Sequence, residues 1–204
     1  MVRLHTNLQN PQKRIIRAAA TVLEEGGLIV YPTYTVYGLG CDLFNKKAIE
    51  RIYRLKGVKK RRRLSFICPD LKDIAIYAQV STPSYKIMRH LTPGPFTFIL
   101  RATRQVPKIL LEKRKTVGIR VPDSRVCGDL LAEFGRPIIS SSACPPELDY
   151  LNDPEEIAEK FGHAIDLFLD AGWGGAELST VMDLTEDDPL ILRQGKGYSE
   201  DLLP

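Results

Sequence analysis

The sequence predicts a mixed α/β fold of the α+β kind, in a single domain that spans residues 1–204. Apolar residues at helical spacing alternate along the chain with short β-rich runs, and no unit of about 20–50 residues repeats. Several expected strands follow one another without a helix long enough for a parallel crossover, which argues against a simple doubly wound sheet. No long Gly-, Ser- or Pro-rich linker divides the chain.

The composition is that of a soluble globular protein, with 44% hydrophobic and 26% charged residues. No apolar run approaches the roughly 18–20 residues that span a bilayer, and residues 1–7 lack the pattern of a signal peptide. We therefore expect a cytoplasmic protein with no membrane partner. The four cysteines form no Cys-x-x-Cys pair and the three histidines are scattered, so we expect neither a zinc site nor a disulfide framework.

The first half of the chain is expected to begin with a helix that starts at Asn10-Pro11 and ends at Gly26-Gly27. A strand at 28–31 and a polar loop at 33–42 follow it. Further expected elements are a helix at 46–55, a strand at 64–68, a helix that opens at Ser81 and a strand at 96–100.

The second half is expected to hold shorter elements. We predict helices at 106–111 and 129–134, and a third that Asp153 caps with Pro154 in its first turn. Strands are expected at 116–121, 137–139, 165–169, 180–184 and 190–193.

The charge distribution says more than the net charge of +4. Eight of the thirteen residues at 51–63 are Lys or Arg, and acidic residues gather later in the chain, at 149–159 and 186–188. Such asymmetry favours a polyanionic partner. A solvated charged loop explains it about as well, and the sequence leaves both interpretations open. The consecutive basic residues are Lys59, Lys60, Arg61, Arg62 and Arg63.

Hydroxyl and basic side chains recur where strands or helices are expected to end. The segment 32–40 carries hydroxyls and glycines between a strand and a helix, which suits an anion or an ordinary turn, but it matches neither a Walker loop nor a dinucleotide fingerprint. Lys56 closes a helix, where a lysine binds phosphate or simply complements the helix dipole. Arg120 interrupts an apolar strand and needs an internal acid or an anionic ligand.

The remaining candidates also suit an anion, and a helix cap stays open as the alternative for the serine run. Ser140, Ser141 and Ser142 follow a buried strand, and Ser179 precedes Arg193 by fourteen residues. The sequence contains no nucleophile elbow and no paired acids or histidines for acid–base work, and nothing marks a base that would activate Cys144. What remains is positioning and charge neutralisation, the usual means of phosphoryl and nucleotidyl transfer.

These segments, in this order, resemble the YrdC/YciO-like family, whose best-characterised members are threonylcarbamoyl-AMP synthases. The resemblance runs from about Gly26 to Gly195. The stretches that carry it are Pro32-Thr33-x-Thr35-Val36-Tyr37-Gly38-Leu39, Lys56, Pro93-Gly94-Pro95-x-Thr97, Thr116-Val117-Gly118-x-Arg120-Val121-Pro122, Ser142-Ala143, Ser179-Thr180 and Arg193-x-Gly195.

The resemblance implies a twisted mixed sheet with helices around a basic concave surface. It also implies that ATP, bicarbonate and L-threonine, usually with Mg²⁺, form threonylcarbamoyl-AMP, which partner proteins use to modify tRNA. Carried over by position, Lys56 and Arg120 would be catalytic. L-threonine would lie near Thr33, Arg120, Ser140 and Ser179, and ATP near Lys56, Thr116, Ser142 and Arg193.

The sequence departs from the synthases at four positions, which places it closer to the YciO-like branch. Where synthases carry an acid, an arginine, an asparagine and a proline, this chain has Tyr34, Val58, Cys144 and Gln194. The departures imply reduced activity, because a valine neutralises no phosphate and a thiol replaces a carboxamide poorly. Two alternatives stay open. One is a non-enzymatic protein that binds double-stranded RNA or tRNA through residues 59–63, and the other is a related acyl-adenylate enzyme with another substrate.

Overall fold

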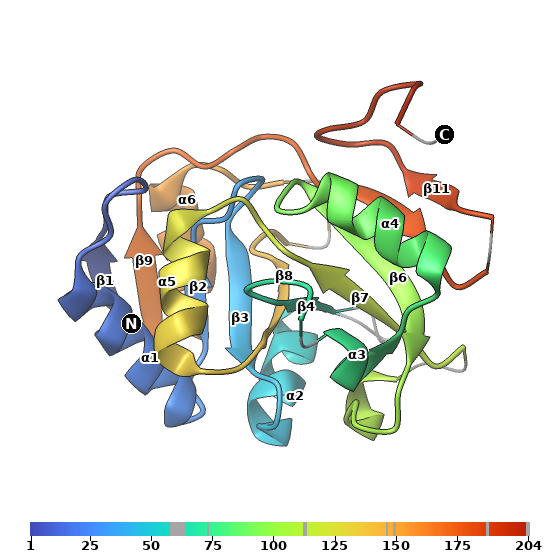
Figure 1. Ribbon diagram of the computed structural model, residues 1–204. Coiled ribbons are helices and arrows are strands. Elements are labelled where there is room, and N and C mark those ends of the chain that lie inside the picture. Colours follow the sequence, from blue (N-terminus) through green and yellow to red (C-terminus); the bar gives the residue numbers. More distant parts are fainter. Residues whose placement is uncertain are drawn as a thin grey trace.

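A computed structural model describes residues 1–57, 64–72, 74–111, 114–145, 147–148, 150–186 and 188–202 of the chain. It confirms the mixed α/β fold, with one continuous mixed sheet and helices against it (Figure 1). The described helices are α1 (Lys13–Glu24), α2 (Lys46–Leu55), α3 (Ile74–Tyr77), α4 (Thr82–Leu91), α5 (Arg125–Phe134) and α6 (Pro154–Phe161), with a 3₁₀ turn at Lys108–Leu110.

The strands of the sheet come from the whole length of the chain. In chain order they are β1 (Val2–His5), β2 (Ile29–Tyr31), β3 (Gly38–Asp42), β4 (Ser65–Ile67), β5 (Ala78–Gln79), β6 (Phe96–Ala102), β7 (Thr116–Arg120), β8 (Ile138–Ser142), β9 (Leu167–Asp170), β10 (Thr180–Asp183) and β11 (Leu190–Arg193).

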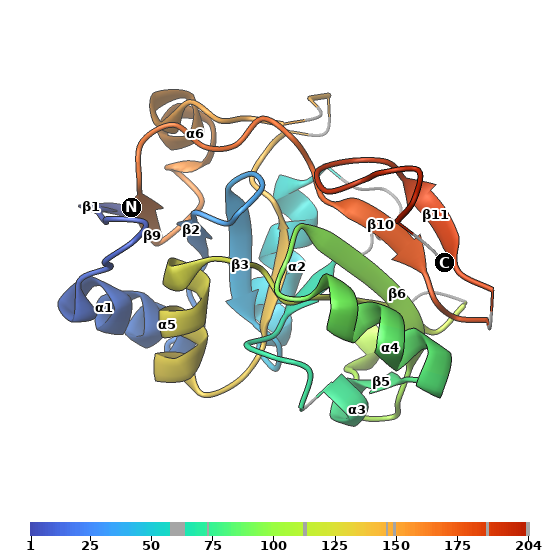
Figure 2. The same cartoon turned by 45° about the horizontal axis from the view of Figure 1, so that its top comes forward.

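The order of strands across the sheet is β1-β9-β2-β3-β8-β4-β7-β6-β10-β11, and β5 pairs with β6. Parallel pairs, such as β4 with β7 and β6 with β10, are mixed with antiparallel pairs, such as β3 with β8 and β6 with β7. The strand β6 is inclined to β3 in both ribbon views, so the sheet is strongly twisted (Figure 2). The twist agrees with the expectation from the sequence, and the central strands come from distant parts of the chain.

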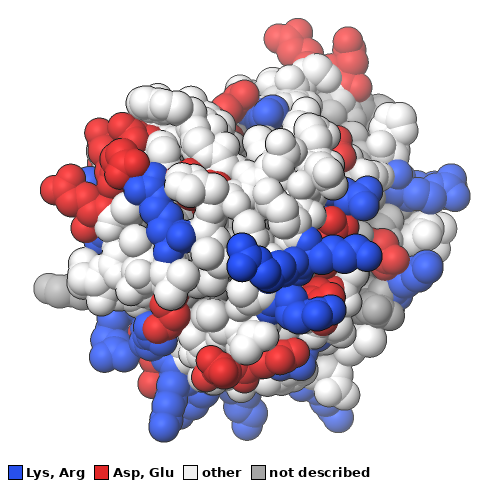
Figure 3. All heavy atoms as spheres, turned by 90° about the vertical axis from the view of Figure 1, so that its left-hand side faces the viewer, with Lys and Arg blue, Asp and Glu red and all other residues white. Residues whose placement is uncertain are grey.

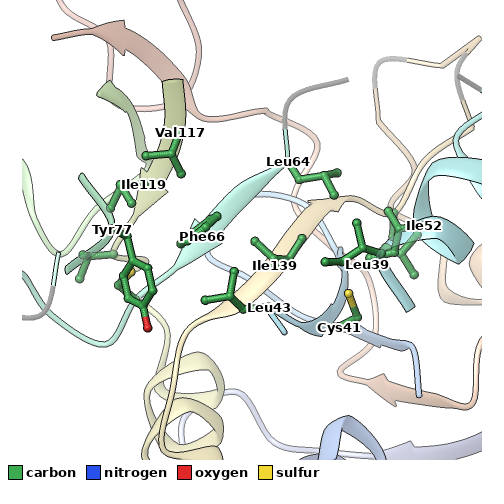
Figure 4. Close-up of a cluster of buried hydrophobic side chains, with 14 of the residues drawn as sticks. Leu39, Cys41, Leu43, Ile52, Leu64, Phe66, Tyr77, Val117, Ile119 and Ile139 are labelled. Atoms are coloured by element: carbon green, nitrogen blue, oxygen red, sulfur yellow. The ribbon is translucent and has the colours of Figure 1, made fainter. Parts of the chain in front are cut away.

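Alternation along the central strands places apolar side chains on both faces of the sheet. Phe66 and Ile139 belong to one hydrophobic cluster, together with residues of α2 and α6 (Figure 4). Their neighbours Ile67 and Ile138 belong to the other cluster, which α1 and α5 complete. Each face is therefore buried along part of the sheet, and the polar site described below occupies a stretch that the α1–α5 pair leaves uncovered.

The prediction of a loop at 33–42 is wrong for its second half, because Gly38–Asp42 forms the strand β3. All residues of β3 are buried. Its backbone pairs with β2 on one side and β8 on the other. The ring of Tyr31 occupies the space above the two glycines, so that a Cβ at Gly40 would lie 2.8 Å from it. A sequence pattern of glycine and polar residues usually indicates a turn. In this strand the glycines instead leave space for a buried tyrosine ring.

The helix expected at 106–111 is only the 3₁₀ turn at Lys108–Leu110, and three element boundaries differ from the expectation by several residues. The first helix starts at Lys13 and not at Asn10, because the Asn7 side chain accepts hydrogen bonds from the backbone of Gln9 and Asn10 and holds them in a turn. The helix α5 starts at Arg125, since Ser124 caps it. The strand β8 continues through Ser142, so the serines lie in the sheet and not beyond it. The strand β1 and the short elements α3 and β5 were not expected.

None of the described helices is both long and apolar enough to cross a bilayer. At the β1 edge of the sheet, Lys and Arg side chains are interspersed with Asp and Glu around a broad uncharged area (Figure 3). Part of this mixture is paired, since Arg3 contacts both Glu155 and the buried Asp170. The face in this view therefore does not present a one-sign basic surface.

We predict that Gly40→Ala destabilises the fold by about 1–3 kcal/mol, because the added methyl group would overlap the buried ring of Tyr31. Gly128→Ala is the matched control, since a Cβ there has no atom within 4 Å and lies in the helix α5. It should stabilise by about 0.5–1 kcal/mol. Urea unfolding measures both; equal free energies of unfolding for the two variants would contradict the packing described for β3.

Candidate functional site

A cavity of about 280 Å³ opens on the uncovered stretch of the sheet. Three cationic side chains line it, those of Lys56, Arg120 and Arg193, and none of its described lining residues is Asp or Glu. Hydroxyl groups supply most of the remaining polar surface, from Thr35, Ser65, Thr97, Ser140, Ser141, Ser142 and Ser179. Positive charge and hydroxyl donors without a carboxylate give this cavity a lining that suits an anionic ligand.

Strand register forms the floor of the cavity. Ser65 lies opposite Ser140 on one neighbouring strand and opposite Gly118 on the other, and Gly118 lies opposite Ile99. These positions share one face of the sheet because directly paired residues point the same way. A Cβ at Gly118 would lie 3.0 Å from the Ser65 hydroxyl oxygen and 3.5 Å from Ile99, so glycine keeps the floor low.

Arg120 is the cation whose bonding is least complete. Its Nη2 donates to the Thr35 hydroxyl at 2.9 Å, while its Nε is buried without a hydrogen-bond acceptor. Among the described residues it forms no ion pair. Burial lowers the pKa of its guanidinium, and repulsion from the nearby charge of Arg193 lowers it further. A buried guanidinium without a carboxylate is costly. An anionic ligand in the cavity would supply the missing acceptor.

The loop 33–36 presents Thr35 to this arginine. The Thr33 hydroxyl donates to the carbonyl oxygen of Val36 at 2.6 Å and accepts the backbone N–H of Thr35 at 3.2 Å. Thr33 is thus committed to holding the turn, and Thr35, which is 1% exposed as a residue, makes the contact with Arg120. Of the two threonines, Thr35 lines the cavity and Thr33 positions it.

Lys56 enters the cavity from the C-terminal end of α2. Its ammonium donates to the carbonyl oxygen of Ser142 at 3.0 Å and to that of Cys144. The thiol of Cys144 lies 3.8 Å from the same ammonium and 3.2 Å from the Ser142 hydroxyl oxygen. The end of β8 and the end of α2 are therefore joined through one cation, and the lysine charge is fixed beside the serine hydroxyls.

A second group of contacts fixes the far wall, where β10 pairs with β6 on one side and with β11 on the other. The Ser179 hydroxyl lies 2.8 Å from that of Thr97 and accepts from Arg193 Nη2 at 3.1 Å. Arg193 Nε also donates to the carbonyl oxygen of Ser179. Burial lowers the pKa of the Arg193 guanidinium, which forms no ion pair with a described acid. The charge of Arg193 is thus held in place, like that of Arg120, without being neutralised.

Tyr31 fixes the hydroxyl group of Ser140. The buried phenol donates to the Ser140 oxygen at 2.8 Å, and burial raises the pKa of the phenol, so it stays a donor. Since the oxygen of Ser140 accepts from Tyr31, its own proton is free to point toward the cavity. Ser140 is thereby positioned to donate a hydrogen bond to a ligand in the cavity.

The structure brings six of the residues expected from the sequence to this cavity: Lys56, Arg120, Ser140, Ser142, Ser179 and Arg193. Thr116 lines a separate hollow with Arg101 and Arg114, and Thr33 lines the neighbouring cavity on the other side of its loop. The residues 59–63 and Val58 lie outside the described residues.

Sequence reasoning did not select Thr35, Ser65 and Thr97 as site residues. Thr35 and Thr97 stand in the motifs that carry the resemblance, so the motifs held a signal for them. Ser65 carried no such signal, because one serine at the start of a short strand is unremarkable. Only the register with β7 and β8 places it on the cavity floor.

The donors of this site do not form a metal cage. Among the described residues no three His, Cys, Asp or Glu side chains gather at one point, and the cavity itself offers hydroxyls and cations. Mg²⁺ prefers carboxylate and phosphate oxygens. The described lining residues include no carboxylate that would hold Mg²⁺.

The chain is similar in sequence and in fold to known proteins. Residues 21–195 match the model of the Sua5/YciO/YrdC family, which carries the description "Telomere recombination". The chain is 40% identical over 190 residues to the uncharacterized protein YciO of Escherichia coli, with 92% of each chain covered. The crystal structure of E. coli YciO superposes with a TM-score of 0.92, at 38% identity, and covers 99% of this chain and 98% of that one.

The relatives with a named activity are more distant. The threonylcarbamoyl-AMP synthase of Halorhodospira halophila is 33% identical over 166 residues, which cover 81% of this chain and 87% of the synthase. The structure of P. abyssi Sua5 complexed with L-threonine superposes with a TM-score of 0.88 at 28% identity. That match covers 96% of this chain and 58% of the P. abyssi chain, so P. abyssi Sua5 contains a further region.

We predict that Arg120→Leu makes the free protein about 1 kcal/mol more stable, because it removes a buried charge that has no carboxylate partner. Inorganic pyrophosphate should stabilise the wild-type protein in thermal unfolding and bind the variant about tenfold more weakly, a difference of about 1.4 kcal/mol. A variant that is less stable than wild type and keeps the full pyrophosphate effect would show that Arg120 serves the fold alone.

Proposed function

Because the chain belongs to the Sua5/YciO/YrdC family, we propose that its cavity forms threonylcarbamoyl-AMP from ATP, bicarbonate and L-threonine, as a step in the threonylcarbamoyladenosine modification of tRNA. The protein would work in the cytoplasm as a single domain over residues 1–204 and pass its product to partner proteins that act on tRNA. The proposal goes beyond family membership, since YciO of E. coli is itself uncharacterized.

The observation that carries the proposal is the convergence of three cations on a cavity whose described lining has no acid. All three substrates carry negatively charged groups: L-threonine has a carboxylate, bicarbonate a single negative charge and ATP a triphosphate. The unsatisfied Nε of Arg120 suits a carboxylate, because a guanidinium can donate two parallel hydrogen bonds to it. Lys56 and Arg193 lie on the remaining walls, where they would neutralise phosphate oxygens.

The reaction asks the protein for positioning and charge. The threonine amine adds to bicarbonate with loss of water, which gives a carbamate. A carbamate oxygen then attacks the α-phosphorus of ATP, a new P–O bond forms, and the bond to pyrophosphate breaks with the electron pair leaving on pyrophosphate. The described lining supplies donors for the charge that builds on the phosphate, including Lys56 and Ser142. It provides no carboxylate or histidine base, and a preformed carbamate needs none.

Two of the four departures from the synthases, Cys144 and Tyr34, lie beside the proposed site without lining its cavity. Cys144 sits behind Ser142, with its thiol 3.2 Å from that hydroxyl oxygen, where the synthases carry a carboxamide. Tyr34 lies outside the main cavity, on the neighbouring one. We therefore propose that ground-state binding survives while turnover is reduced, since the transition state needs every donor in place.

Double-stranded RNA or tRNA binding through Lys59, Lys60, Arg61, Arg62 and Arg63 stays an alternative proposal, because eight of thirteen residues at 51–63 are basic. Binding of this kind falls steeply with salt as phosphate neutralisation releases counterions. A duplex RNA that shows no binding even at low salt would remove the alternative.

We expect that pyrophosphate release by the purified protein requires ATP, bicarbonate and L-threonine together. Arg120→Leu should lower the rate at least 100-fold, about 2.7 kcal/mol of transition-state stabilisation. Arg17→Leu is the control, since Arg17 is 75% exposed and pairs with Glu133 on the surface. Release of pyrophosphate without threonine, or equal rates for the two variants, would contradict the proposed reaction.

The double variant Val58→Arg with Cys144→Asn should form threonylcarbamoyl-AMP at least tenfold faster than wild type, equivalent to about 1.4 kcal/mol off the barrier. The restored groups act on the transition state, so the affinity for ATP should change much less. Chromatography of the adenylate and calorimetry of ATP binding measure the two quantities. Wild-type turnover that already matches an authentic synthase would show the departures to be harmless.

A further inference from the structure

A second cavity, of about 750 Å³, adjoins the first on the other side of the loop 33–36. Thr35 lines both cavities, so this loop is the partition between them. The second cavity differs in chemistry from the first. Prolines and the aromatic side chains of Tyr34 and Trp173 supply much of its wall, and its charged residues are Asp123, Arg125 and Lys196.

Exposed aromatic surface gathers at this cavity. Trp173 is 71% exposed, the largest value among the described large hydrophobic residues, and Tyr34 is 42% exposed. Leu8, at 43%, lines the same hollow. Single exposed apolar residues are common on proteins, but three around one cavity mark a binding surface.

Both aromatic residues stand on backbone that is held in place. Hydrogen bonds hold the backbone on either side of Trp173. The carbonyl oxygen of Gly172 accepts from the Tyr37 hydroxyl at 2.7 Å, and the N–H of Gly174 donates to the carbonyl oxygen of Asn152 at 2.8 Å. The next residue, Gly175, packs so closely on the partition loop that a Cβ would lie 1.8 Å from the Thr35 carbonyl oxygen. The exposure of Trp173 is therefore not that of a loosely attached loop.

Tyr34 is fixed as well. The Lys196 ammonium lies 4.0 Å from the centre of its ring, in a cation–π contact, and donates to the Tyr34 carbonyl oxygen at 3.1 Å. The contact places a positive charge beside an exposed ring. The occupant of this cavity should therefore combine a flat aromatic surface with a negative charge.

Charge supports a polyanion over a single small molecule. Among their described lining residues, the two cavities together present one acid, Asp123, and five cations, of which Arg125 also pairs with Asp129. The other four cations are Lys56, Arg120, Arg193 and Lys196. A nucleic acid strand offers repeated phosphates for the cations and base faces for the rings. A duplex hides the faces of its bases in the helical stack, so it suits the rings less well.

We propose that the second cavity binds unpaired bases of single-stranded RNA, which stack on Tyr34 and Trp173 while the phosphates lie toward Lys196 and Arg125. The site is separate from the basic run at 59–63 and does not depend on the synthase reaction, because none of its aromatic residues lines the first cavity. A strand bound here would lie against the partition loop that holds Thr35.

Trp173 is the only tryptophan of the chain, so its fluorescence reports on this cavity alone. A single-stranded RNA of about twelve nucleotides is titrated into the full-length protein, alongside the same sequence as a duplex and ATP at equal nucleotide concentration. The single strand should quench Trp173 with an affinity that falls as salt rises, and the duplex and ATP should leave most of the emission unchanged.

Variants assign the quenching to stacking. Tyr34→Ala should weaken the single strand about tenfold, within the range for loss of one stacked base. Tyr85→Ala is the matched control, because Tyr85 is 45% exposed but lines a different hollow on α4, and it should bind within twofold of wild type. No quenching by the single strand, equal quenching by duplex or ATP, or an unaffected Tyr34→Ala would each overturn the proposal.

Discussion

The buried contact between Arg120 and Thr35 is the interaction on which the rest of the site depends. Arg120 Nη2 donates to a hydroxyl, whereas a buried guanidinium ordinarily donates to a carboxylate. Arg120 Nε has no acceptor. The fold tolerates the unfavourable free energy of this incompletely bonded guanidinium because the surrounding contacts hold Thr35 in one position. Thr33 holds the turn that presents Thr35, and Gly175 allows a second loop to pack against that turn. An incompletely bonded cation held this firmly is pre-organised for an anion.

The sheet supplies the scaffold for that cation. Its central strands bring Ser65, Gly118 and Ser140 into register, although these residues are far apart along the chain. The adjacent strands orient Ser140. The glycines of β3 leave space for the ring of Tyr31, and the Tyr31 phenol donates a hydrogen bond to the Ser140 hydroxyl. The partition loop divides the polar surface into an anion cavity and an aromatic one, so one short segment separates two kinds of chemistry.

Much of this could be predicted from the sequence, and the exceptions have physical reasons. The helix at 46–55 was predicted to the residue, because its apolar spacing is a local signal. The structure adds a cap from the Asn45 side chain. The strand Gly38–Asp42 was not, since its stability comes from pairing with β2 and β8 and not from its own residues. For the site, Lys56 and Arg193 stand in motifs, whereas Ser65 enters only through register. Thr116 was expected near ATP, and it lines a separate hollow that touches the main cavity through Ile99.

We infer that Arg120 Nε lacks an acceptor in the free protein because its partner is a substrate anion. The most direct measurement is a crystal structure of the protein with L-threonine and a non-hydrolysable ATP analogue. The account predicts an anionic oxygen of a bound ligand within hydrogen-bond distance of Arg120 Nε, with the Arg120–Thr35 contact retained or replaced by the ligand. A structure in which both ligands bind elsewhere, with Arg120 still without an acceptor, would contradict it.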